Sequence, residues 1–192
     1  MDTSPVRTRR WSRVEYESLI DQGVFQPGER IELIGGELVV REPQRTPHAT
    51  AIELALDALK EVFGPGWRVR IQLPVALDDE SEPEPDVAVV PGSPRDYLPS
   101  HPARPVLIVE IAHSSLAFDR EQKGSLYARA GIADYWIVNL VDRILEVYRD
   151  PALAPHGPYG WGYGSVVALR AGDLVSPLAA PHARIRIADL LP

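Results

Sequence analysis

The amino-acid sequence predicts an α/β domain that is built on a mixed β-sheet with helices packed against it. Two observations lead to this fold class. Three apolar stretches, typical of strands, follow one another at residues 67–77, 86–90 and 105–112. Segments that favour helices lie before and after them, at residues 46–64 and 119–130. A helix, a central group of apolar strands and another helix therefore indicate an α/β domain.

The first 41 residues predict an arm, a short helix and a hairpin. Residues 1–13 are basic, and we expect them to form a flexible arm. Residues 14–23 predict a short helix that ends at a glycine. RIELIGGELVVR (30–41) has alternating strands around a glycine pair, which is typical of a β-hairpin with a two-residue turn. We expect residues 14–192 to form one domain, since no long linker or internal repeat divides the chain.

The segment at residues 46–64 predicts a longer helix. Thr46 is the expected N-cap, and Pro47 would occupy the first helical position. Apolar residues then recur at helical spacing until Gly64 ends the helix. His48 precedes Ile52 by four residues, so it should share the inward-facing stripe near the helix start.

The second half of the chain predicts a further helix and several antiparallel strands. After an acidic turn (78–85) and a proline-rich loop (91–105), Gly131 closes the helix at 119–130. Residues 133–140 and 143–150 predict a second hairpin around Val141-Asp142, followed by a loop at 151–164 and a strand at 164–170. A short tail completes the chain, and these C-terminal strands are expected to extend the sheet by antiparallel pairing.

Composition and charge narrow the functional classes. A net charge of −7 argues against a protein that coats nucleic acid, although a local basic patch or a divalent cation could still recruit it. The absence of cysteine excludes disulfides and thiolate metal sites, and it favours the cytoplasm. No run of 18 apolar residues or secretory signal is present, so we expect no membrane association.

Two carboxylates stand where the chain is expected to build buried strands. Glu110 shares a strand face with Ile108 and Ala112, and Asp86, at the start of the strand 86–90, shares a face with Ala88 and Val90. A buried carboxylate needs a basic side chain, backbone donors or a metal as its partner. If the two strands are neighbours, Asp86 and Glu110 could converge at one edge of the sheet. Two hard oxygen ligands with open coordination positions suit Mg²⁺.

A lysine on the next helix could complete the group. Asp119, Lys123 and Tyr127 recur at every fourth position, on the side that should pack against the sheet. Lys123 is therefore expected to point towards the strands. An ammonium beside a bound metal could orient or help to deprotonate an attacking water, or stabilise charge on a phosphate.

These residues resemble a known family. The order Pro85-Asp86, then Glu110 inside an apolar strand, then a lysine is similar to the PD-(D/E)xK nuclease superfamily. RIELIGGELV, the following His48, EPDVAVV and VEIAHSSLAFDREQKGSLYARAGIADYWIV more closely resemble the Uma-type family of restriction endonucleases. The tail GDLVSPL…IRIADLL is similar too, so the resemblance covers residues 14–191.

The resemblance implies a restriction-endonuclease-like core and Mg²⁺- or Mn²⁺-dependent cleavage of DNA phosphodiester bonds. Asp86 and Glu110 would bind the metal, with the Ile111 carbonyl as a further candidate ligand. Lys123 would assist the water. Glu32 and His48 match family positions that could line the site.

One departure from the superfamily motif concerns the lysine. The motif places it two residues after the acid, where this chain has Ala112. Lys123 lies 13 residues after Glu110, on the next helix, and the Uma-type pattern places its lysine there.

Each candidate also has a structural explanation. Glu110 could pair with an arginine or with helix amides, Asp86 could cap a turn, and Lys123 could pair with Asp119 on a solvated helix face. His48 could be a satisfied residue near a helix start, and Glu32 could face solvent. Three functions therefore stay open: a metal-dependent deoxyribonuclease, a hydrolase of another phosphoester, and a non-catalytic interaction or dimerisation module. A homodimer would suit a nuclease that cuts both DNA strands.

Overall fold

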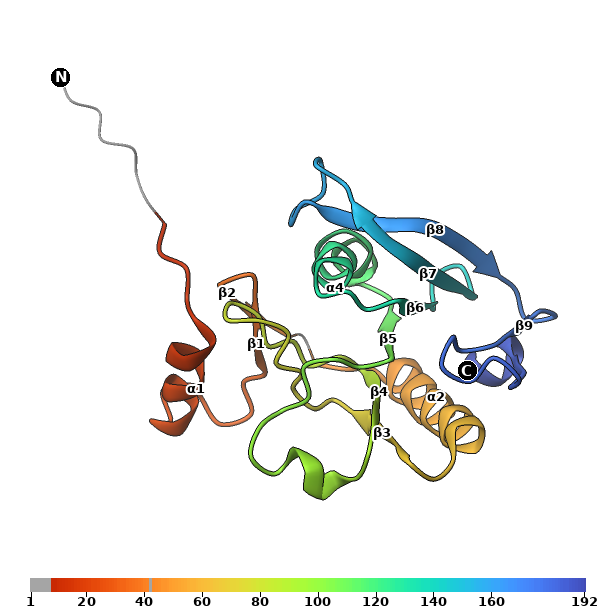
Figure 1. Ribbon diagram of the computed structural model, residues 1–192, viewed down its shortest axis with the longest axis horizontal. Coiled ribbons are helices and arrows are strands. Elements are labelled where there is room, and N and C mark those ends of the chain that lie inside the picture. The colour runs from red at the N-terminus through yellow and green to blue at the C-terminus, as the bar shows by residue number, and fades with distance from the viewer. Residues whose placement is uncertain (1–7, 42) are drawn as a thin grey trace.

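The computed structural model describes residues 8–41 and 43–192, and it confirms the α/β fold class. A six-stranded mixed sheet has the order β3-β4-β5-β6-β7-β8, and helices pack against it (Figure 1). Its strands are β3 (Trp67–Ile71), β4 (Val87–Pro91), β5 (Leu107–Ala112), β6 (Asp134–Asn139), β7 (Ile144–Leu153) and β8 (Trp161–Leu169). Strands β5 and β6 are parallel, whereas the other neighbours in this sheet are antiparallel.

The parallel pair is joined by a helical crossover that lies on one face of the sheet. It begins as α3 (Leu116–Phe118), widens into the π-helical turn η2 (Asp119–Lys123) and ends as α4 (Gly124–Arg129). The predicted helix therefore starts three residues earlier than expected. Gly131 follows it with a φ of +75°, in agreement with the predicted glycine stop. An apolar cluster fills the space between this crossover and the sheet: Ile108, Ala112, Tyr127, Ile132, Tyr135 and Ile137.

Helix α2 (Thr46–Phe63) contributes to the apolar core on the opposite face. Its buried residues pack with the alternate side chains of β4, β5 and β6: Val87, Val89, Val109, Ile111, Trp136 and Val138. The expected N-cap was wrong, because Arg45 is the cap and Thr46 is the first helical residue. Pro47 is tolerated at the second position, since backbone N–H groups in the first turn have no helical partner in any case.

The N-terminal segment forms the predicted helix and hairpin. Helix α1 (Arg13–Asp21) starts at a capping box formed by Ser12 and Glu15. Strands β1 (Ile31–Ile34) and β2 (Glu37–Val40) pair across the glycine turn and form a separate two-stranded sheet.

Residues 1–7 of the expected arm lie outside the described residues. Within the described part of the arm, the Trp11 N–H donates to the Gly36 carbonyl (2.9 Å). The arm therefore contacts the hairpin turn.

Two predicted boundaries were wrong. The strand expected over 67–77 ends at Ile71, because Gln72 has a φ of +49° and Pro74 lacks an N–H for a ladder. The loop expected over 151–164 is shorter, because β7 and β8 continue pairing through Leu153 and Trp161. The proline and glycines there suggested a loop, yet the two strands keep the same register on both sides of Asp150, which has a φ of +59°.

The C-terminal tail does not all join the main sheet. Strand β8 extends it, as predicted, but β9 (Leu174–Val175) and β10 (Ile185–Arg186) form their own antiparallel pair. The 3₁₀ turn η3 (Ile187–Leu190) then packs beside α2 (Figure 1). A further 3₁₀ turn, η1 (Pro94–Tyr97), lies in the proline-rich loop. None of the helices in residues 8–41 and 43–192 is both long and apolar enough to cross a membrane.

Candidate active site

Asp86 and Glu110 lie side by side on adjacent strands. The antiparallel register pairs Val87 with Val109, so Asp86 falls opposite Glu110. The Asp86 N–H donates to Glu110 Oε2 (3.3 Å), and the Ile111 N–H donates to Asp86 Oδ2 (2.8 Å). Both side chains are almost fully buried, with 1% exposure each. The convergence expected for neighbouring strands is therefore present.

Lys123 reaches the same place from the crossover helix. Its ammonium lies 3.0 Å from Glu110 Oε1 and 3.2 Å from Glu32 Oε2, and the residue is buried. One turn later, the Tyr127 hydroxyl donates to Glu110 Oε1 (2.7 Å). Lys123 therefore faces the strands, as its spacing predicted, and not the solvent.

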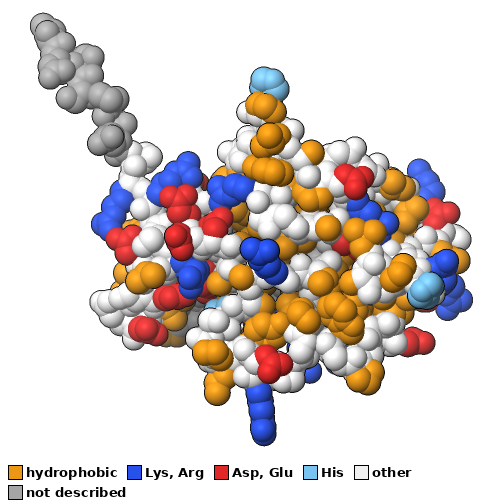
Figure 2. Space-filling view, viewed as in Figure 1, with side chains coloured by type: hydrophobic (Ala, Val, Ile, Leu, Met, Phe, Trp, Pro, Cys, Tyr) orange, Lys and Arg blue, Asp and Glu red, His pale blue; other side chains and the backbone are white. Residues whose placement is uncertain are grey.

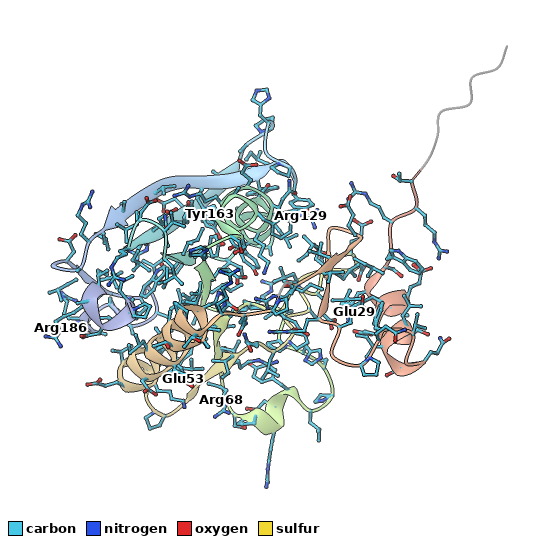
Figure 3. The ribbon with its side chains drawn as sticks, turned by 180° about the vertical axis from the view of Figure 1, so that it is seen from behind. Glu29, Glu53, Arg68, Arg129, Tyr163 and Arg186 are labelled. Carbon is cyan, nitrogen blue, oxygen red and sulfur yellow. The ribbon has the colours of Figure 1, made fainter. Side chains whose placement is uncertain are left out.

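The β1–β2 hairpin closes the group from the N-terminal side. Glu32 is buried, and its Oε2 accepts a hydrogen bond from the Glu84 N–H (3.0 Å). Arg41, just after β2, places Nη2 at 2.8 Å from Asp86 Oδ1 and Nε at 2.9 Å from Glu32 Oε1. Arg41 therefore links Glu32 of the hairpin to Asp86, one of the two candidate metal ligands. Figure 3 shows side chains filling the space between this hairpin and the crossover helix.

Sequence reasoning missed Arg41, although strand alternation contained a signal. Glu32 pairs with Val39, so Arg41 lies two residues beyond the partner of Glu32, on the same face of the hairpin. A cation in that position is the expected partner for a buried carboxylate.

His48 enters the group from the first turn of α2. Its Nε2 lies 3.2 Å from Asp86 Oδ2. This nitrogen is buried, yet it makes no well-aligned hydrogen bond with any residue of the described chain. His48 and Glu32, the two additional residues indicated by the family resemblance, therefore both lie beside the central carboxylates.

Asp119 is a fourth buried carboxylate that was not predicted as a site residue. It precedes Lys123 by one turn and accepts a hydrogen bond from the Ser115 hydroxyl (2.6 Å). Burial raises the pKa of Asp119, the Lys123 charge opposes this shift, and the Asp86 charge adds to it. The sequence spacing of Asp119 and Lys123 could have indicated this, but the same spacing is common on solvated helix faces.

The assembled group carries surplus negative charge. Three of the four buried carboxylates (Glu32, Asp86 and Glu110) contact two cations (Arg41 and Lys123), and the charge of the fourth, Asp119, acts on Lys123. With all four carboxylates ionised and a neutral histidine, the group has an excess of two negative charges. Such an excess, held away from water, favours any ligand that adds positive charge.

Burial and neighbouring charges shift the protonation of the central residues. Burial raises the pKa of Glu110 to about 7, although the Lys123 charge opposes the shift. Burial would also raise the pKa of Asp86, but the contacts with His48 and Arg41 outweigh it and hold that pKa well below its usual range. The two adjacent carboxyl groups therefore differ in their affinity for a proton.

The central carboxylates retain some capacity to accept further bonds. Asp86 Oδ1 accepts one hydrogen bond, from Arg41, and Glu110 Oε2 accepts one long bond, from the Asp86 N–H. A carboxylate oxygen has two lone pairs, so each of these atoms could take one more partner. In the described chain, no three histidine or carboxylate side chains are grouped so that they alone could hold a metal ion.

Comparisons with known proteins agree with the resemblance seen in the sequence. A family model named Uma2 and described as "Putative restriction endonuclease" matches residues 13–187. The fold is similar to a crystal structure described as a "putative nuclease belonging to DUF820" from Anabaena variabilis, with a TM-score of 0.66 and 18% sequence identity. That similarity covers 88% of this chain and 94% of the other. No curated protein matches the chain. Because the family match spans most of the sequence, the chain belongs to the Uma2 family.

Proposed function

We propose that this protein is a metal-dependent endonuclease that hydrolyses phosphodiester bonds in DNA. The observation that carries the proposal is the buried cluster of Asp86, Glu110 and Lys123, which come from two adjacent strands and the crossover helix. The chain's membership of a family described as "Putative restriction endonuclease" supports the same reaction class. A metal-binding carboxylate pair beside a lysine suits phosphodiester hydrolysis.

The residues fit Mg²⁺ or Mn²⁺. Asp86 Oδ1 and Glu110 Oε2 each keep one acceptor position, and the surrounding group has an excess of negative charge. A hard divalent cation needs only one or two protein carboxylates and keeps several waters, so a larger set of side chains is not required. The Ile111 carbonyl remains a further candidate ligand.

The proposed roles follow from the contacts. A bound metal would supply an activated water and stabilise the leaving oxygen. Asp86 and Glu110 would hold it, while backbone N–H groups and Tyr127 keep the two carboxylates in position. Lys123 lies between the carboxylates of Glu110 and Glu32, which favour its charged form. We therefore assign Lys123 to orienting the water and stabilising phosphate charge, in preference to abstracting a proton.

Cleavage and metal titration together test this function. The wild-type chain should cleave DNA with Mg²⁺ or Mn²⁺, and the metal should raise its unfolding temperature. Asp86→Asn and Glu110→Gln should each lose cleavage by at least about a hundredfold and lose most of the metal-dependent stabilisation. Glu53→Gln, at an exposed position of α2, is the matched control and should change neither quantity.

Two outcomes would redirect the proposal. Cleavage of RNA but not of single- or double-stranded DNA would assign another phosphoester as the substrate. Absence of cleavage with every divalent ion, together with unchanged behaviour of Glu110→Gln, would favour a non-catalytic interaction module. A homodimer, which would place two sites on opposite strands, is also part of this proposal, and sedimentation of the wild-type chain would test it.

A further inference from the structure

Two basic side chains of the buried cluster are more exposed than its other members. The carboxylates of Glu32, Asp86 and Glu110 and the ammonium of Lys123 belong to side chains that are 2–4% exposed. The Arg41 and His48 side chains, which both contact Asp86, are 14% and 17% exposed. A substrate group that approaches Asp86 from this side would therefore meet Arg41 and His48 first.

Arg41 keeps two hydrogen-bond donors free among the described residues. Its Nη1 donates to the Glu84 carbonyl (2.6 Å), and its Nη2 donates to Asp86 Oδ1 (2.8 Å). Each terminal nitrogen carries two N–H groups, so one on each remains without a partner in the described chain. Paired donors of a guanidinium match two oxygens of a phosphate group, which is the arrangement that arginine uses for phosphate recognition.

His48 supplies a second polar atom at the same place. Its Nε2 is buried beside Asp86 and makes no well-aligned hydrogen bond with the described residues. The Asp86 carboxylate lies 3.2 Å from this nitrogen without an aligned hydrogen bond, so a ligand or a water could still satisfy it. An imidazole nitrogen that carries a proton can donate to a phosphate oxygen.

We propose that Arg41 and His48 bind the scissile phosphate of the substrate, beside the carboxylate pair. This inference rests on the proposed nuclease function and assigns it a phosphate-binding pair. With this pair beside the carboxylates, a cluster with excess negative charge could still bind an anionic substrate. The metal would offset the excess negative charge, and Arg41 would present its free N–H groups to the diester.

Binding and cleavage of a labelled DNA duplex test the proposal. Affinity is measured by fluorescence anisotropy of the full chain in Ca²⁺, and KM is measured in Mg²⁺. Arg41→Lys keeps the positive charge beside Asp86 and Glu32 but loses the planar pair of donors. It should weaken binding and raise KM by about tenfold or more, and His48→Gln should do so by about threefold to tenfold.

Control variants distinguish the loss of a phosphate contact from the loss of any surface charge and from damage to the fold. Arg68→Ala removes an exposed arginine from β3, and His156→Gln changes an exposed histidine in the β7–β8 loop. Both should bind DNA within about twofold of wild type. The Mg²⁺ midpoint of thermal stabilisation should also stay within about twofold of wild type in Arg41→Lys and His48→Gln.

Salt dependence gives a readout that a purely structural role would not change. Arg41→Gln removes one charge from the site, so the slope of log Kd against log salt should fall by about one if Arg41 contacts a phosphate. An unchanged slope, together with wild-type KM in Arg41→Lys, would overturn the inference while leaving the nuclease function intact. A wild-type chain that neither binds nor cleaves nucleic acid would overturn both.

Discussion

Glu110 illustrates how a single residue can indicate a site before its partners are known. A carboxylate within the apolar stretch LIVEIA requires compensation, and strand alternation placed it on the covered face of the sheet. The structure provides that compensation through Lys123, Tyr127 and the Asp86 N–H. The sequence could not indicate Arg41 with equal force, because an arginine at a hairpin end is ordinary unless its cross-strand neighbour is known to be buried.

Glu82 offers a pH-dependent test of a buried carboxylate outside the proposed catalytic group. It is 2% exposed, and its Oε2 has no aligned partner among the described residues. Burial raises its pKa from 4.5 to about 7, and the nearby Glu17 and Glu84 charges act in the same direction, whereas Arg13 opposes them. Between pH 4.5 and about 7, the folded chain therefore keeps a proton on Glu82 that the unfolded chain has released.

We predict that Glu82→Gln stabilises the protein more at pH 8 than at pH 5. The stability associated with protonated Glu82 is fully present below pH 4.5 and is lost as the pH rises through 7. Glutamine does not titrate, so the stability of the variant relative to wild type should increase by about 2–3 kcal/mol between the two pH values. Urea unfolding measures it, with Glu53→Gln as the control. An equal effect at pH 5 and pH 8 would contradict the assignment.

At the scale of elements, regular periodicity was predictable and local departures from it were not. The glycine pair in RIELIGGELVVR predicted the hairpin turn, and both glycines have positive φ angles of +56° and +83°. The π-helical turn at Asp119–Lys123 was not predictable, because DREQK contains ordinary helix formers. The extra residue in this turn nevertheless belongs to the segment that directs Lys123 towards Glu110.

The hairpin turn provides a test of how the element that carries Glu32 is held. At Gly35, an added Cβ would overlap the Tyr159 ring from the β7–β8 loop, and the Gly35 φ is positive. At Gly28, φ is +84°, but an added Cβ would meet no atom within 4 Å. The two glycines therefore share the backbone requirement and differ in the contact.

We predict that Gly35→Ala is more destabilising than Gly28→Ala. The backbone cost alone should be about 1–2 kcal/mol for each, and the overlap with Tyr159 should add about 1–3 kcal/mol at Gly35. When Tyr159 is already alanine, Gly35→Ala should lower the unfolding free energy by no more than Gly28→Ala does in the wild-type chain. Equal unfolding free energies for the two single variants would indicate that the hairpin does not depend on the Tyr159 contact.

At the scale of the whole molecule, the fold class and the order of elements followed from periodicities within short segments. The contacts that complete the site did not follow from such periodicities, because they join Glu32 and Arg41 to a strand and a helix much later in the chain. Such long-range pairings depend on the packing of the hairpin, which has no signature in local sequence. The cytoplasmic location expected from the absence of cysteine stays a prediction.

The overall charge gives a prediction for the intact protein. The chain has a net charge of −7, and the face in Figure 2 shows Lys and Arg side chains interspersed with Asp and Glu. Long-range attraction to a polyanion is therefore weak. The proposed site itself has four carboxylates and two cations, so we expect a phosphate to enter it favourably only after a cation has been added.

DNA binding should consequently require a divalent ion. Removing Mg²⁺ or Ca²⁺ with EDTA, at an ionic strength kept constant with NaCl, should weaken duplex binding by at least about tenfold, since the excess negative charge would face the phosphate directly. Fluorescence anisotropy of the wild-type chain measures the change. In Glu110→Gln the metal effect should be smaller, because one proposed metal ligand is lost, whereas Glu53→Gln should match wild type. Equal affinity with and without divalent ions would mean that DNA contacts another surface and that the carboxylate group is not where the phosphate binds.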